Sequence, residues 1–493
     1  MGSLARQALL NTALTYVGIA LGFVNVVLLY PKVLSSEEFG LTRLLVSMVV
    51  MAAQIAQLGA DNTINRYFPY FRDPARAHRG FLSMLLLFGV AVGLLAMLVL
   101  SVLHPWLSQV FSDRSALYAR YGLLVLPLVF SEIFFLLLRS YSRSLRRTVQ
   151  PTFIREFLLR VLQTLLIAWQ AWRPMPFGSF IVVYASLFLI CTLVLVYDLY
   201  LAGHWKPGWT GRWLPARMRR SMVAYGGFTL SASLAGIVLG NMDQLMIGAL
   251  LGDGLKYVAH YAVAFYFGSV IAAPGRAIAQ AALPHVADAW KRRDDNALRS
   301  MYLRSANMQT FISGTLFVLL LGNVDDLFLL LPAEYAGGAM IAVVIGSAYF
   351  LNASVGLSTS IISMSRSYRV DAWSSMVMLV INAVGNYFLI LAYGIAGAAW
   401  ATLISLVVVN GYRTYFLWRR HGLWPFDRVT AILVLGLTGS SIVVSWLPLA
   451  FGPLIDIMFR CFMVLLLILP LAHRFGLLKE GIALISNLRI DHR

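Results

Sequence analysis

Four arginines fall inside long apolar segments of the sequence: Arg66, Arg160, Arg276 and Arg460. A charged side chain at the centre of a bilayer costs about 2.5–3.5 kcal/mol on insertion scales, so it usually faces a cavity or a partner. Arginine also binds phosphate oxygens through two N–H donors at once. Arg276 directly follows Pro274-Gly275, a pair that predicts a helix break. We predict that Arg66, Arg160 and Arg276 line a central cavity and contact an anionic ligand.

Three of these arginines also have a structural interpretation. Arg66 stands near the end of its apolar segment, where a long side chain can snorkel to the interface. Arg160 follows Glu156 by four residues, the spacing of an ion pair along one helix. Arg460 follows Asp456 at the same spacing, and we interpret that pair as structural.

Acidic and amide side chains accompany the arginines in the apolar segments. We take five of them as further candidate substrate-binding residues: Asp61, Asn65, Asn11, Asn25 and Glu132. Glu132 lies near the middle of its segment. A carboxyl group there can be protonated, pair with an arginine or relay protons, and the sequence leaves these roles open.

Two apolar segments, one in each half of the chain, carry polar and small residues at the same spacing. The first set is Asn11, Thr15, Gly18, Gly22 and Asn25, and the second is Thr229, Ser233, Gly236, Gly240 and Asp243. Steps of four and three residues place each set on one helix face. The repeat predicts two related halves, a common transporter plan. Helix packing through small residues is the alternative for the glycines.

The composition places these segments in a membrane. Hydrophobic residues make up 60% of the chain and charged residues only 12%, whereas a soluble domain typically carries about 25% charged residues. Apolar runs of roughly 20 residues are long enough to cross the ~30 Å hydrocarbon layer as helices. We therefore expect an all-α, polytopic membrane protein with about fourteen spans, near 10–33, 41–64, 80–103, 118–140, 152–172, 178–201, 222–249, 257–282, 303–323, 337–362, 371–392, 396–418, 430–450 and 455–473.

These spans predict two pseudo-symmetric six-helix lobes followed by two C-terminal helices. The N-lobe comprises residues 1–210 and the C-lobe residues 211–425, while 426–493 contains the last two spans and a cytoplasmic tail. The expected linker between the lobes is the segment 202–221, which is rich in Trp, Pro and Arg.

The net charge of +18 is unevenly distributed along this arrangement. Most of the 39 Lys and Arg residues fall in the terminal segments and in alternate connections, all on one side of the membrane. By the positive-inside rule that side is cytoplasmic, so both termini are expected inside. The basic excess is expected to meet anionic lipid headgroups, and nucleic acid is not an expected partner.

We expect no cofactor and no nucleotide-driven motor. The two cysteines, Cys191 and Cys461, both lie in apolar runs and form no disulfide framework or metal-binding spacing. The sequence contains no Walker-type phosphate loop. The N-terminal segment is interpreted as a first span rather than as a removed signal peptide.

Several segments resemble the polysaccharide-unit (O-antigen) flippases of the MOP exporter superfamily, and the resemblance covers essentially the whole chain. The segments are Leu34-Ser35-Ser36-Glu37-Glu38-Phe39-Gly40, Leu58-Gly59-Ala60-Asp61-Asn62, Arg66-Tyr67-Phe68-Pro69, Asp243 followed by Tyr257 and Tyr261, and Tyr393-Gly394-Ile395-Ala396-Gly397-Ala398-Ala399-Trp400-Ala401-Thr402. The last is typical of the hairpin between the eleventh and twelfth spans.

The resemblance implies a fold of two lobes around a V-shaped cavity. It also implies a substrate, an oligosaccharide unit linked to an isoprenoid pyrophosphate. The protein would move it by alternating access to the outer leaflet of the bacterial cytoplasmic (inner) membrane. Expected partners are therefore this lipid-linked glycan, membrane lipids and other proteins of polysaccharide or lipopolysaccharide biosynthesis.

The related lipid II flippases have a sodium site made of an acid in span 7, two oxygen-bearing residues in span 11 and a threonine in span 12. The matching residues here are Asp243, Asn382, Asn386 and Thr402. Asn386 replaces the second acid, which removes a charge that a hard cation favours. Coupling to Na⁺ or H⁺ is therefore left open. Those flippases also carry arginines in span 1, where this chain has none beyond Arg6, which argues against lipid II as the substrate.

Two other functions remain open. A cation-coupled exporter of small molecules or drugs shares this fold, but it would present mainly acids to a cationic drug. An integral-membrane glycosyltransferase, ligase or polymerase would need catalytic groups in an outer loop. The expected outer loops are short, and their close acid pairs are Glu37-Glu38 and Asp325-Asp326. We therefore expect a transporter rather than an enzyme.

Overall fold

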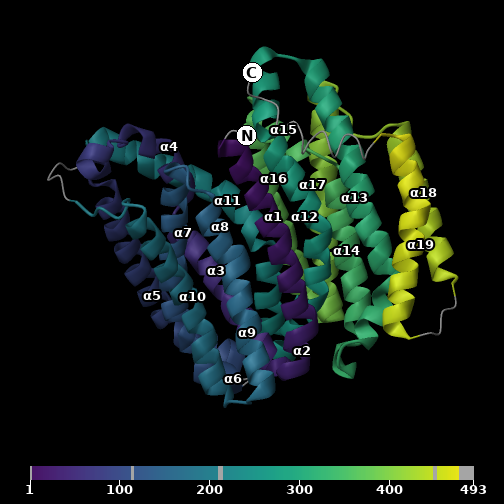
Figure 1. Cartoon of the computed structure of the whole chain (residues 1–493), viewed down its shortest axis with the longest axis horizontal. Coiled ribbons are helices and arrows are strands. Elements are labelled where there is room, and N and C mark those ends of the chain that lie inside the picture. Colours follow the sequence, from purple (N-terminus) through teal and green to yellow (C-terminus); the bar gives the residue numbers. More distant parts are fainter. Residues whose placement is uncertain (1–2, 113–115, 209–214, 448–451, 477–493) are drawn as a thin grey trace. The chain divides into compact units, whose positions relative to one another are not determined.

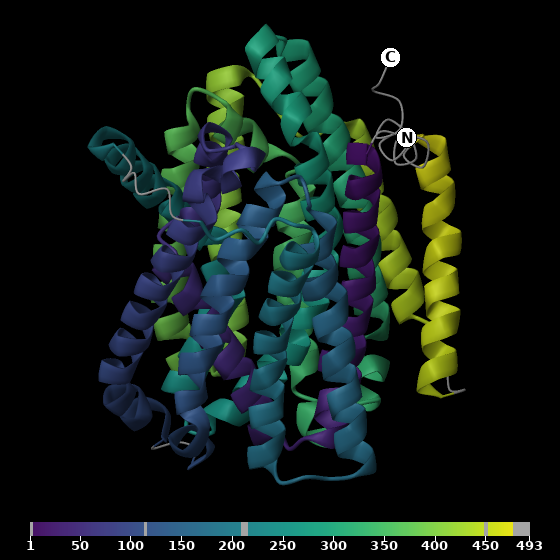
Figure 2. The same ribbon diagram turned by 60° about the vertical axis from the view of Figure 1, so that its left-hand side comes forward.

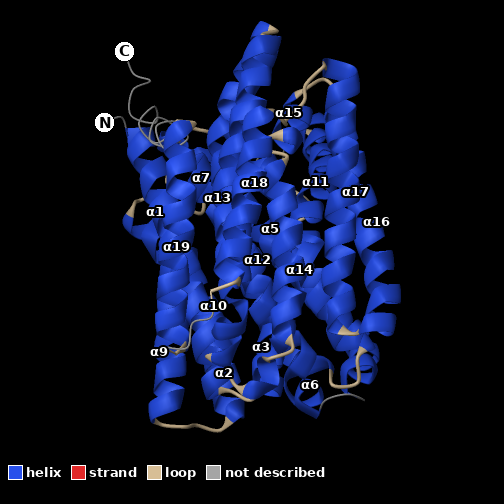
Figure 3. Cartoon of the chain, turned by 90° about the vertical axis from the view of Figure 1, so that its right-hand side faces the viewer, coloured by secondary structure: helices blue, strands red, loops and turns tan. Residues whose placement is uncertain are grey.

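The computed structural model describes residues 3–112, 116–208, 215–447 and 452–476, and all regular elements in these ranges are helices (Figure 3). The chain forms two compact units. The N-terminal unit is Arg6–Ala259, and the C-terminal unit contains the described residues from His260 onward. This confirms the all-α class. The predicted lobe boundary at 210/211 stays a prediction, and residues 209–214 and 477–493 of the predicted linker and tail lie outside the described ranges.

The N-terminal unit is built around α7, which packs against α3, α4, α5 and α10 (Figure 1). Its helices are α1 Ser3–Phe23, η1 Val24–Leu29, α2 Tyr30–Val33, α3 Ser36–Ala56, α4 Ala60–Tyr67, η2 Phe68–Tyr70, η3 Pro74–Gly80, α5 Phe81–Ser112, α6 Ala116–Tyr121, η4 Gly122–Leu124, α7 Val125–Ser144, α8 Val149–Thr152, η5 Phe153–Leu158, α9 Leu159–Trp172, α10 Phe177–Leu201 and α11 Ala216–Leu250. The segments η1 and η5 are π-helical turns inside longer helices.

The C-terminal unit contains a closely packed helix pair, α16 with α17, and a trio in which α18 and α19 pack on α13 (Figure 2). Its helices are α12 Gly254–Arg292, which begins in the N-terminal unit, α13 Asp295–Leu329, η6 Ala333–Tyr335, α14 Gly338–Ser354, α15 Ser358–Met364, α16 Tyr368–Tyr393, α17 Ile395–His421, α18 Arg428–Ser445 and α19 Pro453–Arg474. Apart from their contact with each other, the two C-terminal helices α18 and α19 thus pack mainly against α13.

Eleven of these helices are long and apolar enough to cross a membrane, or twelve if the bent pair α14 and α15 is one span. The predicted count of about fourteen is not confirmed. The two other predicted spans, 152–172 and 222–249, are helical in α8 to α9 and in α11. The first carries Arg155, Glu156 and Arg160 close together, which lowers its hydropathy.

The helix predicted at 41–64 is broken in two. Ser35 begins α3 with a capping box, since its hydroxyl accepts from the Glu38 amide and the Glu38 carboxylate accepts from the Ser35 amide. The helix ends at Ala56, and the left-handed backbone of Leu58 and Gly59, with φ of 48° and 71°, turns the chain into the short helix α4.

Helix α4 packs against α11 through two glycines. A Cβ atom at Gly59 would lie 2.2 Å from the Gly226 carbonyl oxygen, and a Cβ atom at Gly226 would lie 2.7 Å from the Leu58 carbonyl oxygen. The next residue, Gly227, has no heavy atom within 4 Å of such a Cβ atom. Of these two neighbouring glycines, Gly226 therefore serves close helix packing and Gly227 does not.

The predicted helix hairpin at 393–402 is present, with Gly394 at its turn. Gly394 has φ 60° and ψ −140°, a conformation that favours glycine. A break expected after Pro274-Gly275 does not occur, because α12 continues through both residues. In the last helix, Arg460 forms an ion pair with Asp326 of α13 and donates to the Gly322 carbonyl at 3.0 Å. Arg460 is therefore structural, although Asp326 is a partner that the i,i+4 rule did not indicate.

We expect Gly226→Ala to destabilise the protein by about 1–3 kcal/mol, because the added methyl group overpacks the contact with Leu58. The matched control is Gly227→Ala, which should be neutral or stabilise α11 by up to about 1 kcal/mol. Thermal unfolding of the detergent-purified variants measures both. Equal unfolding temperatures would contradict the proposed packing role.

Candidate functional site

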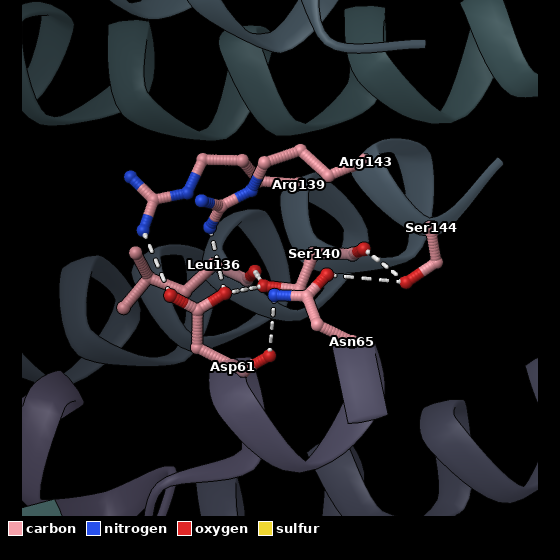
Figure 4. A network of polar contacts seen from close by, with 7 residues as sticks. All are labelled: Asp61, Asn65, Leu136, Arg139, Ser140, Arg143 and Ser144. Carbon is pink, nitrogen blue, oxygen red and sulfur yellow. Dashed lines mark hydrogen bonds and ion pairs between the residues drawn. The ribbon is translucent and has the colours of Figure 1, made fainter. Parts of the chain in front are cut away.

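A polar network that contains two of the predicted site residues joins α4 to α7 (Figure 4). The Asp61 carboxylate accepts a hydrogen bond from Arg143 at 2.7 Å and another from the Ser140 hydroxyl, and it lies 3.9 Å from an Arg139 nitrogen. One turn along α4, the Asn65 side-chain oxygen accepts from the Ser144 hydroxyl at 3.2 Å. Asp61 and Asn65, both predicted, are thus brought together on one face of α7.

The arginines of this network are under-used as donors. Among the described residues, Arg139 makes no hydrogen bond and has only the 3.9 Å ion pair. Arg143 donates only to Asp61, and the buried Nε atoms of both arginines lack a partner. Their side chains are 34% and 37% exposed, so each is partly accessible.

A second ion pair continues the same face of α7. Glu132 is buried, at 4% exposure, and accepts from Arg155 of η5 at 2.8 Å. The Arg155 guanidinium also lies over the rings of Phe135 and Phe188. Of the three roles left open for Glu132, the structure shows the ion pair.

Arg160 takes the alternative expected from its spacing, an ion pair with Glu156 at 3.1 Å. Its backbone carbonyl accepts from the Asn25 side chain at 3.0 Å, and the Asn25 oxygen accepts from the Thr164 hydroxyl at 2.8 Å. Asn25 therefore joins the π-helical turn η1 to α9.

Asn11 and Gly18 also tie α1 to the same part of the unit. Asn11 donates to the Thr148 hydroxyl at 2.9 Å. A Cβ atom at Gly18 would lie 2.6 Å from the Glu156 carbonyl oxygen, so this glycine serves close helix packing. Ser233 and Gly236 of the matching stripe lie outside the residues whose side chains are described.

Arg66 and Arg276 are exposed. The Arg66 guanidinium lies 4.2 Å from the centre of the Tyr225 ring, and Arg276 donates to the Ser269 carbonyl at 3.3 Å. Neither has an acidic partner within the part of the chain that the structure describes. Their contact with a ligand, and that of Arg160, stays a prediction.

The charges on and around α7 do not balance. Three guanidinium groups, those of Arg139, Arg143 and Arg155, face the two carboxylates of Asp61 and Glu132. One positive charge is left over, and it attracts a negative charge. The arrangement therefore favours an anionic ligand, and arginines with free donors suit the several oxygens of a phosphate.

A nearby ion pair at the end of α10 has one arginine facing one carboxylate. Arg147 donates to both carboxylate oxygens of Asp198, at 2.9 and 3.0 Å. His204 lies shortly after the end of α10. Its pKa is lowered mainly by burial and further by the charges of Arg147 and Lys206, so this imidazole is neutral near pH 7. The Arg147–Asp198 pair leaves no net charge for a ligand, so it serves as a reference for the Asp61 network.

The predicted cation residues fall into two groups. Asn386 donates to the Asn382 oxygen at 3.1 Å, and Asn382 donates to the Thr402 hydroxyl at 3.2 Å. All three are fully buried, and they link α16 to α17 in the C-terminal unit. Asp243 is also fully buried, on α11 of the N-terminal unit. A cation site made by all four residues stays a prediction.

Sequence analysis did not select Arg139, Arg143 and Arg155, because they lie at or beyond the ends of two predicted spans, where basic residues are expected at the cytoplasmic surface. The structure has them within helices, and the connection shortens to residues 145–148. A signal was present, since Glu132, Arg139 and Arg143 are separated by seven and four residues. That spacing places them on one helix face.

The model of the polysaccharide biosynthesis protein family matches residues 31–322. A curated protein of Haloferax volcanii, the probable low-salt glycan biosynthesis flippase Agl15, is 22% identical over 200 residues. The match covers 40% of this chain and 42% of that protein, so less than half of the relative's length is spanned.

Solved structures show the same fold. The lipid II flippase MurJ in an inward closed conformation has a TM-score of 0.74 at 11% identity, covering 95% of this chain and 98% of that chain. A point mutant of the MATE transporter VcmN of Vibrio cholerae has a TM-score of 0.56 at 14% identity and covers 85% and 96%. An outward-facing multidrug resistance MATE transporter of the MOP superfamily has a TM-score of 0.55 at 15% identity and covers 88% and 97%. The predicted MOP exporter fold is therefore confirmed.

We expect Glu132→Gln to lower the free energy of unfolding by about 3 kcal/mol, because it leaves the Arg155 charge without its buried counter-charge. Glu156→Gln breaks a more exposed pair in the neighbouring part of the same unit and should cost less than about 1 kcal/mol. Equilibrium unfolding in mixed micelles measures the difference. A larger loss in Glu156→Gln would refute the assignment of Glu132–Arg155 as the structural pair.

Proposed function

Because the chain belongs to the polysaccharide biosynthesis protein family, we propose that it is a flippase for oligosaccharides linked to an isoprenoid pyrophosphate. It works in the bacterial cytoplasmic membrane with both termini inside, and it moves its substrate to the outer leaflet. Movement occurs by alternating access of the two predicted lobes, 1–210 and 211–425. The flippase named among the relatives and the fold shared with a lipid II flippase support this reading.

The observation that carries the proposal is the surplus of arginine on α7 and η5. Arg139, Arg143 and Arg155 outnumber their two carboxylate partners. A pyrophosphate offers several charged oxygens to the unused guanidinium donors. A cationic drug, the ligand of the alternative exporter function, would be repelled by the same surplus.

Two other elements of the proposal follow from the sequence. Arg66, Arg160 and Arg276 are proposed as further contacts of the pyrophosphate, with Asn11 and Asn25 lining the path of the sugars. Asp243, Asn382, Asn386 and Thr402 are proposed to couple transport to Na⁺ or H⁺. These residues are buried and include one carboxylate, so the site would bind a cation weakly.

The membrane potential can drive the proposed export. A pyrophosphate diester carries about two negative charges, and moving one charge across 100 mV is worth roughly 2.3 kcal/mol, so two charges at ~150 mV gain roughly 7 kcal/mol outward. This energy source needs no ATP, in keeping with a sequence that has no Walker-type loop. A co-transported cation would cancel part of the gain.

We expect a potential that is negative inside to speed outward movement of a lipid-linked oligosaccharide in proteoliposomes, and the opposite potential to slow it, because net negative charge crosses the membrane. The measurement is leaflet accessibility of the glycan under a potassium diffusion potential of either sign. Protein-free vesicles are the control. Equal rates of movement under both signs of the potential would exclude the potential as the driving force. No movement at all would contradict the flippase proposal.

We expect Asp243→Asn to abolish any dependence of transport on Na⁺ or H⁺, because it removes the one carboxylate of the proposed cation site. The rate is measured in the same vesicles with and without each ion gradient. Asp456→Asn, in the C-terminal helix α19, is the matched control and should keep the dependence. If transport by the parent protein needs no ion gradient, Asp243 is structural.

A further inference from the structure

Asp61 contacts both Arg139 and Arg143 of α7 but leaves some of their hydrogen-bond donors unused. It takes one hydrogen bond from Arg143 and none from Arg139, which lies 3.9 Å away. A carboxylate has two oxygens and one charge, whereas a phosphate offers three oxygens and more charge. A phosphate on the two arginines would therefore gain hydrogen bonds that Asp61 leaves unused.

The helix that carries Asp61 has two different partners. Toward α7 it is held by the Asp61 interactions and by the hydrogen bond between Asn65 and Ser144, and Phe68, directly after α4, packs edge-on against the Tyr141 ring of α7. Toward α11 it is held by close packing at Gly226, by the hydrogen bond between Tyr67 and Ser221 at 2.7 Å, and by Arg66 over a tyrosine ring. Loss of the Asp61 contact would thus loosen α4 from α7 but not from α11.

We propose that Asp61 is a built-in competitor for a phosphate-bearing ligand, which binds Arg139 and Arg143, displaces Asp61 and releases α4 from α7. The inference rests on the proposed function for the nature of the ligand. The freed helix turns at Leu58 and Gly59, which have left-handed backbone conformations. Because α4 stays packed on α11, displacement of Asp61 couples ligand binding at α7 to α11.

The first test is the affinity of the full-length protein for inorganic pyrophosphate, measured by calorimetry in phosphatidylcholine nanodiscs. Asp61→Asn removes the competing charge, so we expect binding to tighten about tenfold, as expected for loss of one charge-assisted hydrogen bond. If Asp61 instead orients the arginines, the same substitution weakens binding. Unchanged or weaker binding would overturn the inference.

Asp198→Asn is the matched control for this test. It frees Arg147 from an ion pair of similar exposure in the same unit. A single freed guanidinium should leave the affinity for pyrophosphate unchanged. Equal tightening in both variants would show a general charge effect and refute the competitor role of Asp61.

Nanodiscs with added phosphatidylglycerol identify the source of the displacing phosphate. Weaker binding of pyrophosphate there, and more so in Asp61→Asn, assigns the site to a lipid headgroup. Equal binding in both lipids assigns it to the pyrophosphate of the transported ligand.

The second test follows the release of α4 by disulfide formation between Asn65→Cys and Ser144→Cys, with Cys191 and Cys461 replaced by alanine. Pyrophosphate should slow this crosslink several-fold, and it should have no effect when Arg139 and Arg143 are both changed to Gln. A second pair, Ser131→Cys with Thr192→Cys, replaces a hydrogen-bonded pair between α7 and α10 and should crosslink equally with or without pyrophosphate. Slowing of both pairs, or of neither, would overturn the release of α4.

These tests separate the inference from the proposed function, because neither measures transport. Release of α4 by pyrophosphate without movement of lipid-linked oligosaccharide would keep the inference and remove the flippase. Transport with no effect of Asp61→Asn on pyrophosphate binding would keep the flippase and remove the inference.

Discussion

A charged side chain within a bilayer must meet an opposite charge, an aromatic face or water, because an uncompensated charge there costs several kcal/mol. Much of the N-terminal unit follows from this constraint. The face of α7 that carries Glu132, Arg139 and Arg143 draws α4 and η5 to it, since these elements supply Asp61 and Arg155. The ion pairs thus join α4 and η5 to α7, whereas α3, α5 and α10 pack against α7 without a described ion pair to it.

The π-helical turns of the N-terminal unit carry residues that form or contact these ion pairs. The π-helical turn η5 carries Arg155 and Glu156, and η1 carries Asn25, which bonds to the Arg160 carbonyl. An extra residue per turn rotates the following side chains, and such turns are frequent at functional sites. The broken end of α3 does the same for Asp61, since the turn at Leu58 and Gly59 starts the new helix that aims this carboxylate at α7.

The sequence was sufficient for the helical fold, because runs of apolar residues and a low charge fraction have few other interpretations. It also drew attention to Asp61, Asn65 and Glu132, since acids and amides in apolar runs are rare, and their role as site residues stays a prediction. It was insufficient for their partners. Arg139 and Arg143 follow an apolar run directly, and a hydropathy window cannot tell a last helical turn from a connection. The i,i+4 rule found Arg160–Glu156 but missed Arg460–Asp326, which depends on tertiary packing.

The buried Arg413 of the C-terminal unit differs from the arginines on α7 in the balance of its charge. In the C-terminal unit, Arg413 is held by Asp371 at 2.8 Å and by two serine hydroxyls, so its charge is balanced and its Nε donor has a partner. The buried chain of Asn386, Asn382 and Thr402 is neutral. Among the described polar clusters discussed above, the one on α7 combines surplus positive charge, unused donors and partial exposure. A ligand with several anionic oxygens would gain most there, since each bond replaces an unfilled donor instead of breaking a satisfied pair.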